Sequence, residues 1–235
     1  MKRKNLAFIL LIGVLIAHVM LWVMGVMRAP NTQDGFTPEI NPEKPMVALT
    51  FDDGPDALFT PQVLDLLSSF RVSATFFVSG KNIPGNEKIV KATVNDGHEL
   101  ANHTYSHEDL RTLELQEIEK EIARTQGCVK QAIPEYVLRY VRPPYGRYDE
   151  KVLMAFEEPM VLWDVDSEDW HEEDPMKIYS HVVSNVESGD IIIMHDNGSA
   201  TLEALKLILP VLQEKEYQFV TISQLAQYRT IDMRW

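Results

Sequence analysis

The chain has 235 residues, of which 45% are hydrophobic and 24% are charged. This composition is that of a folded protein with one sizeable domain and an appendage, and it argues against a disordered chain. The formal net charge is −13. The first 28 residues contain four basic side chains and no acidic one, so the rest of the chain carries a net charge of −17. Such an acidic domain is not expected to bind nucleic acid. The single Cys128 cannot form an intrachain disulfide.

An uncharged segment of 22 residues, 6–27, follows a basic tripeptide at residues 2–4. A helix needs about 20 apolar residues to cross a bilayer, whereas a cleaved signal peptide has an apolar core of roughly 7 to 15 residues. Residues 1–28 therefore predict a short cytoplasmic segment and an uncleaved transmembrane signal-anchor. Only Arg28 follows the apolar segment directly, so the charge distribution places the rest of the chain outside the cytoplasm. We expect a single-pass protein of the cell membrane with an extracytoplasmic domain.

Residues 29–44 contain three prolines and predict a spacer, and the domain is expected to occupy residues 45–235. In the domain, short β-branched or aromatic runs alternate with amphipathic stretches, the pattern of parallel strands joined by helices. Seven strands are predicted, at residues 46–51, 73–79, 98–102, 138–142, 160–166, 190–194 and 217–221. Helices are predicted at residues 61–69, 84–95, 114–128, 149–157, 174–187, 200–214 and 222–229. An irregular (β/α)7 barrel or an open doubly wound α/β sheet fits this order. Polar residues follow several strands, which favours the barrel.

Two polar motifs have the residue types of a metal site. Asp52 and Asp53 directly follow the first predicted strand, and His103 and His107 follow the third. The i, i+4 spacing of the histidines predicts two imidazoles on one face of a helical turn. With one of the carboxylates they would form a site that suits hydrolytic zinc and also non-haem iron. Taken singly, the aspartates also suit a helix cap, and the histidines also suit a structural role.

Three further segments carry groups that amide hydrolysis needs. Arg142 ends the fourth predicted strand, and the two prolines after it donate no hydrogen, so the next backbone donor is the N–H of Tyr145, which could bind an oxyanion. Residues 166–170 could supply a carboxylate that orients a histidine and an aromatic wall for a sugar. His195 ends a wholly apolar strand. The ordinary alternatives are a proline-rich turn, an acidic helix start and a core histidine.

In their order along the chain, these segments resemble the motifs of the NodB-type polysaccharide deacetylases, also called carbohydrate esterase family 4. The resemblance covers residues 44–228, and its one visible departure is Ile193, where the family's last motif usually has leucine. The five motif regions are residues 50–55, 103–107, 142–146, 166–170 and 193–195. The resemblance implies an irregular, incomplete barrel. It also implies a metal-dependent hydrolase that releases acetate from the N-acetyl groups of an N-acetylglucosamine-type polysaccharide, such as peptidoglycan or a chitin-like polymer.

The resemblance assigns roles in the proton transfers to two pairs of residues. It makes Asp52 the general base, with Arg142 pairing with it and orienting it. It makes His195 the general acid, with Asp169 orienting it.

The remaining roles concern the metal and the substrate. The resemblance implies that Asp53, His103 and His107 hold one divalent ion, zinc in the first place, with cobalt or another divalent ion as alternatives. It also implies that the backbone N–H of Tyr145 binds the oxyanion and that Trp170 lines the sugar pocket.

The sequence leaves other functions open. An inactive carbohydrate-binding module on the same fold is one, although the matching motif positions are all filled. An O-deacetylase acting on acetylated xylan or another ester could use the same residues. A non-haem iron oxygenase would need no general base and acid around its ligands. The expected partners are a polysaccharide and, through the N-terminal helix, the membrane. The polymer, the metal used in the cell and the oligomeric state are not determined by the sequence.

Overall fold

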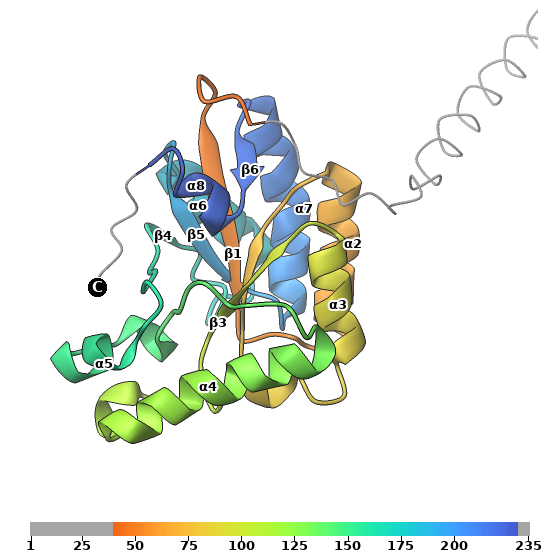
Figure 1. The fold of residues 1–235 in the computed structure, drawn as a ribbon. Coiled ribbons are helices and arrows are strands. Elements are labelled where there is room, and N and C mark those ends of the chain that lie inside the picture. The colour runs from red at the N-terminus through yellow and green to blue at the C-terminus, as the bar shows by residue number, and fades with distance from the viewer. Residues whose placement is uncertain (1–39, 230–235) are drawn as a thin grey trace, which may run out of the picture. The chain divides into compact units, whose positions relative to one another are not determined.

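The computed structural model describes residues 40–229, so the expected transmembrane segment and most of the expected spacer lie outside the described residues. Between residues 40 and 229, no helix has both the length and the apolar character needed to cross a bilayer. These residues form an α/β fold built on a parallel sheet. Figure 1 shows the strands next to a group of helices.

The sheet is centred on β1, whose seven residues are all buried. Strands β2 and β5 pair with β1 in parallel, β3 pairs with β2, β4 pairs with β5, and β6 pairs with the N-terminal half of β1. A parallel strand buried on both faces is a near-continuous apolar run, as in β1. The strands are β1 (Met46–Asp52), β2 (Thr75–Val78), β3 (Glu99–Asn102), β4 (Val165–Asp166), β5 (Ile191–His195) and β6 (Gln218–Val220).

Two isolated bridges extend the sheet beyond β3, because Val141 pairs with both Asn102 and Met160. The chain then runs through residues 160–166 to β4, which pairs with β5. Backbone pairing thus runs from β1 through β2 and β3 to Met160 on one side and through β5 to β4 on the other, and the chain between Met160 and β4 links the two ends. The strand predicted at 138–142 is reduced to the bridge at Val141, so the described sheet has six strands instead of the seven predicted. The two prolines that follow cannot donate ladder hydrogen bonds, which limits this strand.

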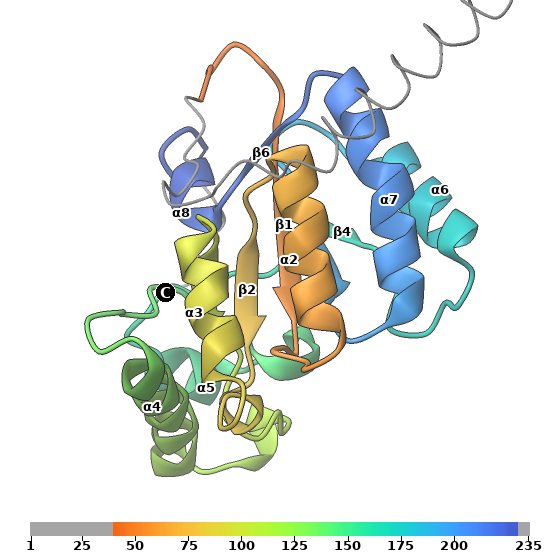
Figure 2. The same cartoon turned by 90° about the vertical axis from the view of Figure 1, so that its right-hand side faces the viewer.

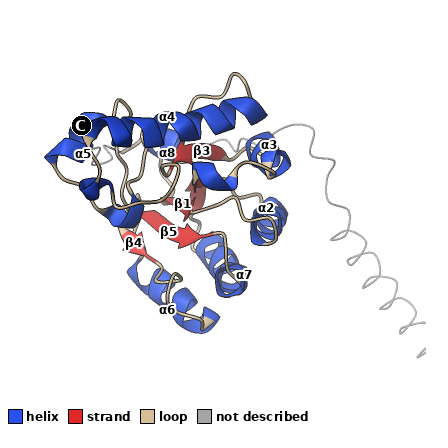
Figure 3. Cartoon of the chain, turned by 90° about the horizontal axis from the view of Figure 1, so that it is seen from below, coloured by secondary structure: helices blue, strands red, loops and turns tan. Residues whose placement is uncertain are grey.

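Helices occur in each of the seven regions where the sequence predicts them. Viewed along the strands in Figure 3, α4, α3, α2, α7 and α6 surround the sheet, and Figure 2 shows α2, α3 and α7 on one side of it. The helices are α2 (Phe59–Phe70), α3 (Glu87–Asn95), α4 (Leu115–Ala132), α5 (Glu150–Ala155), α6 (Pro175–Asn185), α7 (Ser199–Glu214) and α8 (Ile222–Leu225). Three short 3-10 helices are η1 (Gly80–Asn82), η2 (Leu110–Thr112) and η3 (Pro144–Gly146).

Alternate side chains of β1 enter two hydrophobic clusters. Leu49 and Phe51 pack in the large cluster that includes residues of α2 and α7, while Ala48 packs in a smaller cluster with Phe77 and with α8 residues. Period-2 alternation of this kind is expected of a strand covered on both faces. Apolar side chains fill these clusters, and the polar side chains of Asp52, His103 and His195 lie where β1, β3 and β5 end.

Candidate active site

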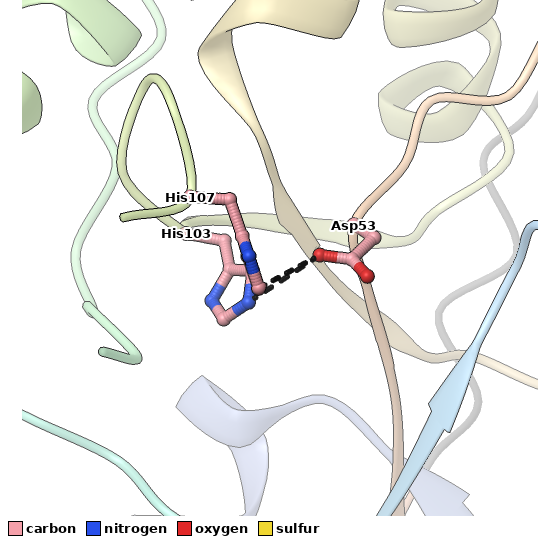
Figure 4. A group of neighbouring side chains, drawn as sticks. All are labelled: Asp53, His103 and His107. Atoms are coloured by element: carbon pink, nitrogen blue, oxygen red, sulfur yellow. Dashed lines mark ion pairs between the residues drawn. The ribbon is translucent and has the colours of Figure 1, made fainter. Parts of the chain in front are cut away.

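Three side chains from two strand ends form a compact group of metal-ligand atoms. Asp53 directly follows β1, and His103 and His107 lie in the loop after β3. In Figure 4 the three side chains point toward one another. One Asp53 oxygen lies 3.6 Å from His103 Nε2 and 3.2 Å from His107 Nε2. One ligand atom from each residue lies within 4.8 Å of the others. Two imidazoles and a carboxylate fit a single divalent ion with open positions.

The loop that carries the two histidines is not the helical turn predicted from their spacing. Thr104 and His107 have left-handed backbones, with φ of 65° and 63°. The Asn102 side chain accepts a hydrogen bond from the Thr104 N–H at 2.9 Å. The buried carboxylate of Glu121 in α4 accepts from two further N–H groups of the loop, at 3.1 and 2.6 Å. Side-chain hydrogen bonds from Asn102 and from Glu121 of α4 therefore replace the helical ladder, yet the imidazole centroids still lie 4.9 Å apart.

The hydrogen bonding of His103 and the burial of His107 suit metal binding. His103 Nδ1 lies 2.8 Å from the carbonyl oxygen of Arg142. A carbonyl only accepts, so Nδ1 is the donor, and Nε2 is the nitrogen directed toward the ligand group. Burial is the largest cause that lowers the pKa of His107, although the charge of Asp53 acts in the opposite direction. The neutral imidazole that ligates metals is thereby favoured.

The buried Asp52 is fixed by a fully buried arginine. Arg142 Nη1 donates to Asp52 Oδ1 at 2.6 Å and to Thr50 Oγ1 at 2.9 Å. Its Nε and Nη2 donate to the backbone carbonyls of residues 161–162 at 3.1 and 2.9 Å. The other Asp52 oxygen, Oδ2, lies 3.6 Å from His103 Nε2. Arg142 thus leaves one carboxylate oxygen facing the metal-ligand group.

A second carboxylate holds His195 at the end of β5. The two oxygens of Asp169 bond the Nδ1 and the backbone N–H of His195 at 2.7 and 2.8 Å, and Thr201 Oγ1 donates to Asp169 at 2.6 Å. Burial alone would lower the pKa of His195, but the Asp169 hydrogen bond and the charges of Asp169, Asp52 and Asp53 raise it to about 9. His195 is therefore protonated at neutral pH, with Nδ1 occupied and Nε2 left to exchange a proton.

Tyr145 lies beside the metal-ligand group. It has a left-handed backbone with φ of 61° inside η3. Within residues 40–229, its N–H makes no hydrogen bond to another group. Its ring packs edge-on against His107 with centroids 4.7 Å apart. Trp170 is 65% exposed and lines the same cavity.

All the predicted site residues except the buried Arg142 line one hollow of about 540 Å³, which we call the catalytic cavity. Arg142 reaches it through Asp52. Motif reasoning missed Arg147, Trp163 and Asn197, which also line the cavity, although each lies within three residues of a motif or strand end. The lining residues are Asp52, Asp53, His103, His107, Tyr145, Arg147, Trp163, Asp166, Asp169, Trp170, Ile193, His195 and Asn197.

Asp196 is a buried carboxyl to which the sequence motifs assign no role. Thr60 Oγ1 donates to its Oδ2 at 2.5 Å, while Oδ1 has no partner among the described residues. A Cβ on Gly54 would lie 2.4 Å from Asp196 Oδ1. Burial raises the pKa of Asp196 to about 7. The Asp196 side chain therefore leaves no room for a side chain at position 54, which explains the glycine there.

Comparisons with known proteins agree with this fold and site. The family model described as polysaccharide deacetylase matches residues 39–158. A peptidoglycan-N-acetylglucosamine deacetylase of Bacillus cereus is 38% identical over 199 residues, which cover 81% of this chain and 92% of that protein. A chitooligosaccharide deacetylase of Sinorhizobium fredii is 35% identical over 196 residues, which cover 77% of this chain and 91% of that protein.

Solved structures show the same fold. The peptidoglycan deacetylase PdaC from Bacillus subtilis superposes with a TM-score of 0.78 at 34% identity, over 81% of this chain and 94% of that one. A family 4 acetyl xylan esterase from Clostridium thermocellum, in complex with a cobalt ion, gives a TM-score of 0.75 at 31% identity, over 79% of this chain and 92% of that one. The chain belongs to the polysaccharide deacetylase family, carbohydrate esterase family 4, and is a hydrolase of that family. The resemblance drawn from the motifs is confirmed.

Proposed function

We propose that this chain is a zinc-dependent N-deacetylase that releases acetate from N-acetylglucosamine units of a cell-wall or chitin-like polysaccharide. The observation that carries the proposal is the convergence of Asp52, the group Asp53, His103 and His107, and His195 on one cavity. The relatives named as peptidoglycan and chitooligosaccharide deacetylases support an N-acetylated sugar polymer as the substrate.

The donor set of Asp53, His103 and His107 fits zinc, because two imidazoles and one carboxylate leave positions open for water and substrate. Arg142 contributes indirectly, since its carbonyl holds His103 in the tautomer that presents Nε2. A divalent ion bound there would lower the pKa of a bound water toward about 7. Cobalt or another divalent ion could occupy the same ligands, and one family structure contains cobalt.

The protein's own residues account for both proton transfers. Asp52 Oδ2 would take a proton from the attacking water, while Arg142 holds the opposite oxygen in place. The N–H of Tyr145 would stabilise the tetrahedral oxyanion, and such a donor is typically worth about 3 to 4 kcal/mol. His195, protonated at neutral pH, would give its Nε2 proton to the departing sugar nitrogen as the carbon–nitrogen bond breaks. The products are acetate and the free amino sugar.

The test is acetate release by the purified full-length protein from chitin oligosaccharides and from peptidoglycan. We expect release from at least one substrate, its loss with a chelator and its recovery with zinc. Asp52→Asn should slow turnover by at least about 100-fold, because a positioned base contributes roughly 10² to 10⁴-fold. Zinc content should stay near that of the unaltered protein.

A matched variant separates metal binding from proton transfer. His103→Ala should deplete zinc, whereas Asp52→Asn should not. Near-normal turnover by Asp52→Asn would refute its role as the base. A zinc-loaded protein that releases acetate from neither substrate would contradict the N-deacetylase.

An ester substrate is the second candidate. The observation in its favour is the similarity to the acetyl xylan esterase. The same base, oxyanion donor and acid could cleave an O-acetyl group. Faster acetate release from acetylated xylan than from any N-acetylated substrate would favour the esterase.

We also propose that residues 6–27 anchor the protein in the cell membrane with the domain outside the cytoplasm. The support is the length of the uncharged segment and the basic residues before it. Protease added to intact cells should remove the domain. Protection of the domain, or its recovery in a soluble fraction, would contradict the anchor.

A further inference from the structure

The three central residues of the histidine loop, 103–107, bond to the rest of the protein through every backbone polar group they have. Their N–H groups donate to side chains, once to Asn102 and twice to Glu121. Their carbonyl groups accept from the N–H of Gly80 at 2.9 Å, from the N–H of Lys81 at 3.0 Å and from the Lys81 ammonium at 3.0 Å. Because each group is paired outside the three residues, neighbouring segments set the conformation of the loop.

Glu121 supplies the acceptor on the α4 side of the loop. It is 8% exposed and belongs to the buried residues of α4. Its Oε2 accepts from the N–H groups of Tyr105 and Ser106 at 3.1 and 2.6 Å, and it lies 2.7 Å from the Ser106 hydroxyl. Glutamate is almost never buried unless it is paired, so these bonds account for its place on the packed side of the helix.

Further contacts pack the loop between η1 and α4. The Arg124 guanidinium lies 3.5 Å from the centre of the Tyr105 ring, and its Nη1 lies 3.9 Å from Glu121 Oε1. A Cβ added to Gly80 would lie 2.6 Å from Thr125 Oγ1 and 2.8 Å from Tyr105 Cδ2. Glycine in η1 thus allows a close approach to both the helix and the loop.

The two imidazoles are held by different means. The ring of His103 is fixed by a bond between its Nδ1 and a backbone carbonyl at 2.8 Å. The ring of His107 is placed by its backbone, which has a φ of 63° and an N–H that donates to Thr104 Oγ1 at 3.2 Å. Glu121 holds the preceding residue, Ser106. Glu121 therefore acts mainly on the second imidazole.

We propose that Glu121 is a positioning residue for the metal site. Its Oε2 holds the histidine loop in the conformation in which His107 Nε2 lies 3.2 Å from an Asp53 oxygen, so that both can bind one ion. A loop that is already ordered loses less conformational freedom when the ion binds, and the ion binds more tightly. The inference rests on the proposed function for the presence of the ion.

The test measures the zinc affinity of the purified full-length protein by competition with a chelator. Glu121→Met removes the acceptor and keeps a side chain of similar length. Zinc affinity should fall by about 10- to 100-fold, the usual effect of losing a residue that supports a metal ligand. Glu121→Gln keeps one acceptor oxygen without the charge and should retain most of the affinity. Glu119→Met, at an exposed position of α4, should leave the affinity unchanged.

A double variant tests whether Glu121 acts through His107. His107→Ala alone should weaken zinc binding, because a ligand is lost. Adding Glu121→Met should then change the affinity by about 2-fold or less, because the imidazole that Glu121 positions is gone. An equal loss with and without His107 would show that Glu121 acts in another way and would overturn the inference.

A destabilised control separates positioning from a general loss of stability. Leu212 is fully buried in α7, outside the histidine loop and α4. Leu212→Ala should lower the free energy of unfolding, yet the zinc affinity of the folded protein should not change. Weaker zinc binding in Leu212→Ala, to the same extent as in Glu121→Met, would contradict a specific role for Glu121.

The remaining outcomes separate this inference from the proposed function. Unchanged zinc affinity in Glu121→Met, or an equal loss in Glu121→Gln, would overturn the role of Glu121 and leave the deacetylase standing. The predicted losses of zinc affinity, with no acetate release by the unaltered protein, would uphold the role of Glu121 and contradict the deacetylase.

Discussion

Asp169 sets the chemistry of His195 more directly than any other residue. Its carboxylate bonds both the ring Nδ1 and the backbone N–H of His195, and it is itself held by Thr201. The hydrogen bond fixes the tautomer, and the charge favours the imidazolium over the neutral ring. A histidine that would lose its proton more readily on burial is thus kept as an acid at neutral pH.

This arrangement predicts the alkaline limb of the pH profile. Turnover that needs protonated His195 should fall as pH rises through its pKa, which the carboxylates raise from 6.5 to about 9. Asp169→Asn removes the charge, so the limb should move to lower pH. The measurement is kcat against pH for both proteins. Zinc bound to Asp53 would offset one of the charges that raise the pKa of His195, and it would do so equally in the unaltered protein and in Asp169→Asn. An alkaline limb at the same pH in both proteins would therefore refute the role of Asp169.

Two glycines show how differently elements tolerate a side chain. Gly127 lies inside α4, where an added Cβ would meet no atom within 4 Å. Gly54 lies in the turn after β1, where an added Cβ would lie 2.4 Å from Asp196 Oδ1. The first glycine only weakens its helix, whereas the second lets two strand-end segments approach each other.

The two alanine variants should therefore change stability in opposite directions. Gly127→Ala should raise the free energy of unfolding by about 0.5 to 1 kcal/mol, because alanine loses less backbone entropy in a helix. Gly54→Ala should lower it by about 1 to 3 kcal/mol through overpacking, and it should also weaken zinc binding because Asp53 is adjacent. Urea unfolding and zinc titration measure these effects. Equal stability of the two variants would show that the Asp196 contact is unimportant.

Over the whole domain, buried titratable groups act on stability in opposite directions as pH falls. Burial lowers the pKa of His98 from 6.5 to about 4, so the unfolded chain binds more protons than the folded chain between these pH values. The free energy of unfolding therefore decreases as the pH is lowered through this range. Burial raises the pKa of Asp196 from 3.8 to about 7, so the folded state binds more protons in that window and stability rises. Replacing one group isolates its contribution.

His98→Asn should make the domain less sensitive to acid. Asparagine retains an acceptor for the Ala74 N–H, which His98 Nδ1 accepts at 3.1 Å, but it cannot take up a proton. Between pH 7 and pH 5 the variant should lose about 2 kcal/mol less unfolding free energy than the unaltered protein. Urea unfolding at the two pH values is the measurement. His171 is exposed, so His171→Asn should leave the loss of unfolding free energy between pH 7 and pH 5 unchanged. An equally unchanged loss in His98→Asn would contradict the prediction.

Much of the architecture follows from local patterns in the sequence. The apolar runs and amphipathic stretches predicted β1 and β5 within one residue, and they predicted a helix in each region where the described residues form an α-helix, but none of the three 3-10 helices. These elements are set by hydrophobic periodicity, which neighbouring residues determine. The family could also be predicted from short segments, because each motif contains the residue types that are needed at one strand end.

The contacts that complete the site depended on the tertiary structure. The histidine loop is shaped by Glu121 from α4, and the turn after β1 packs against Asp196 from the end of β5. Trp163 enters the cavity wall from a segment predicted as a strand that forms only one bridge and the short β4. The sequence by itself determined the order of the elements, the family and most residues of the catalytic cavity, because each depends on short-range patterns. Only the folded chain determined the loop conformations and the contacts that hold them, because those depend on groups that are distant in sequence and meet through packing.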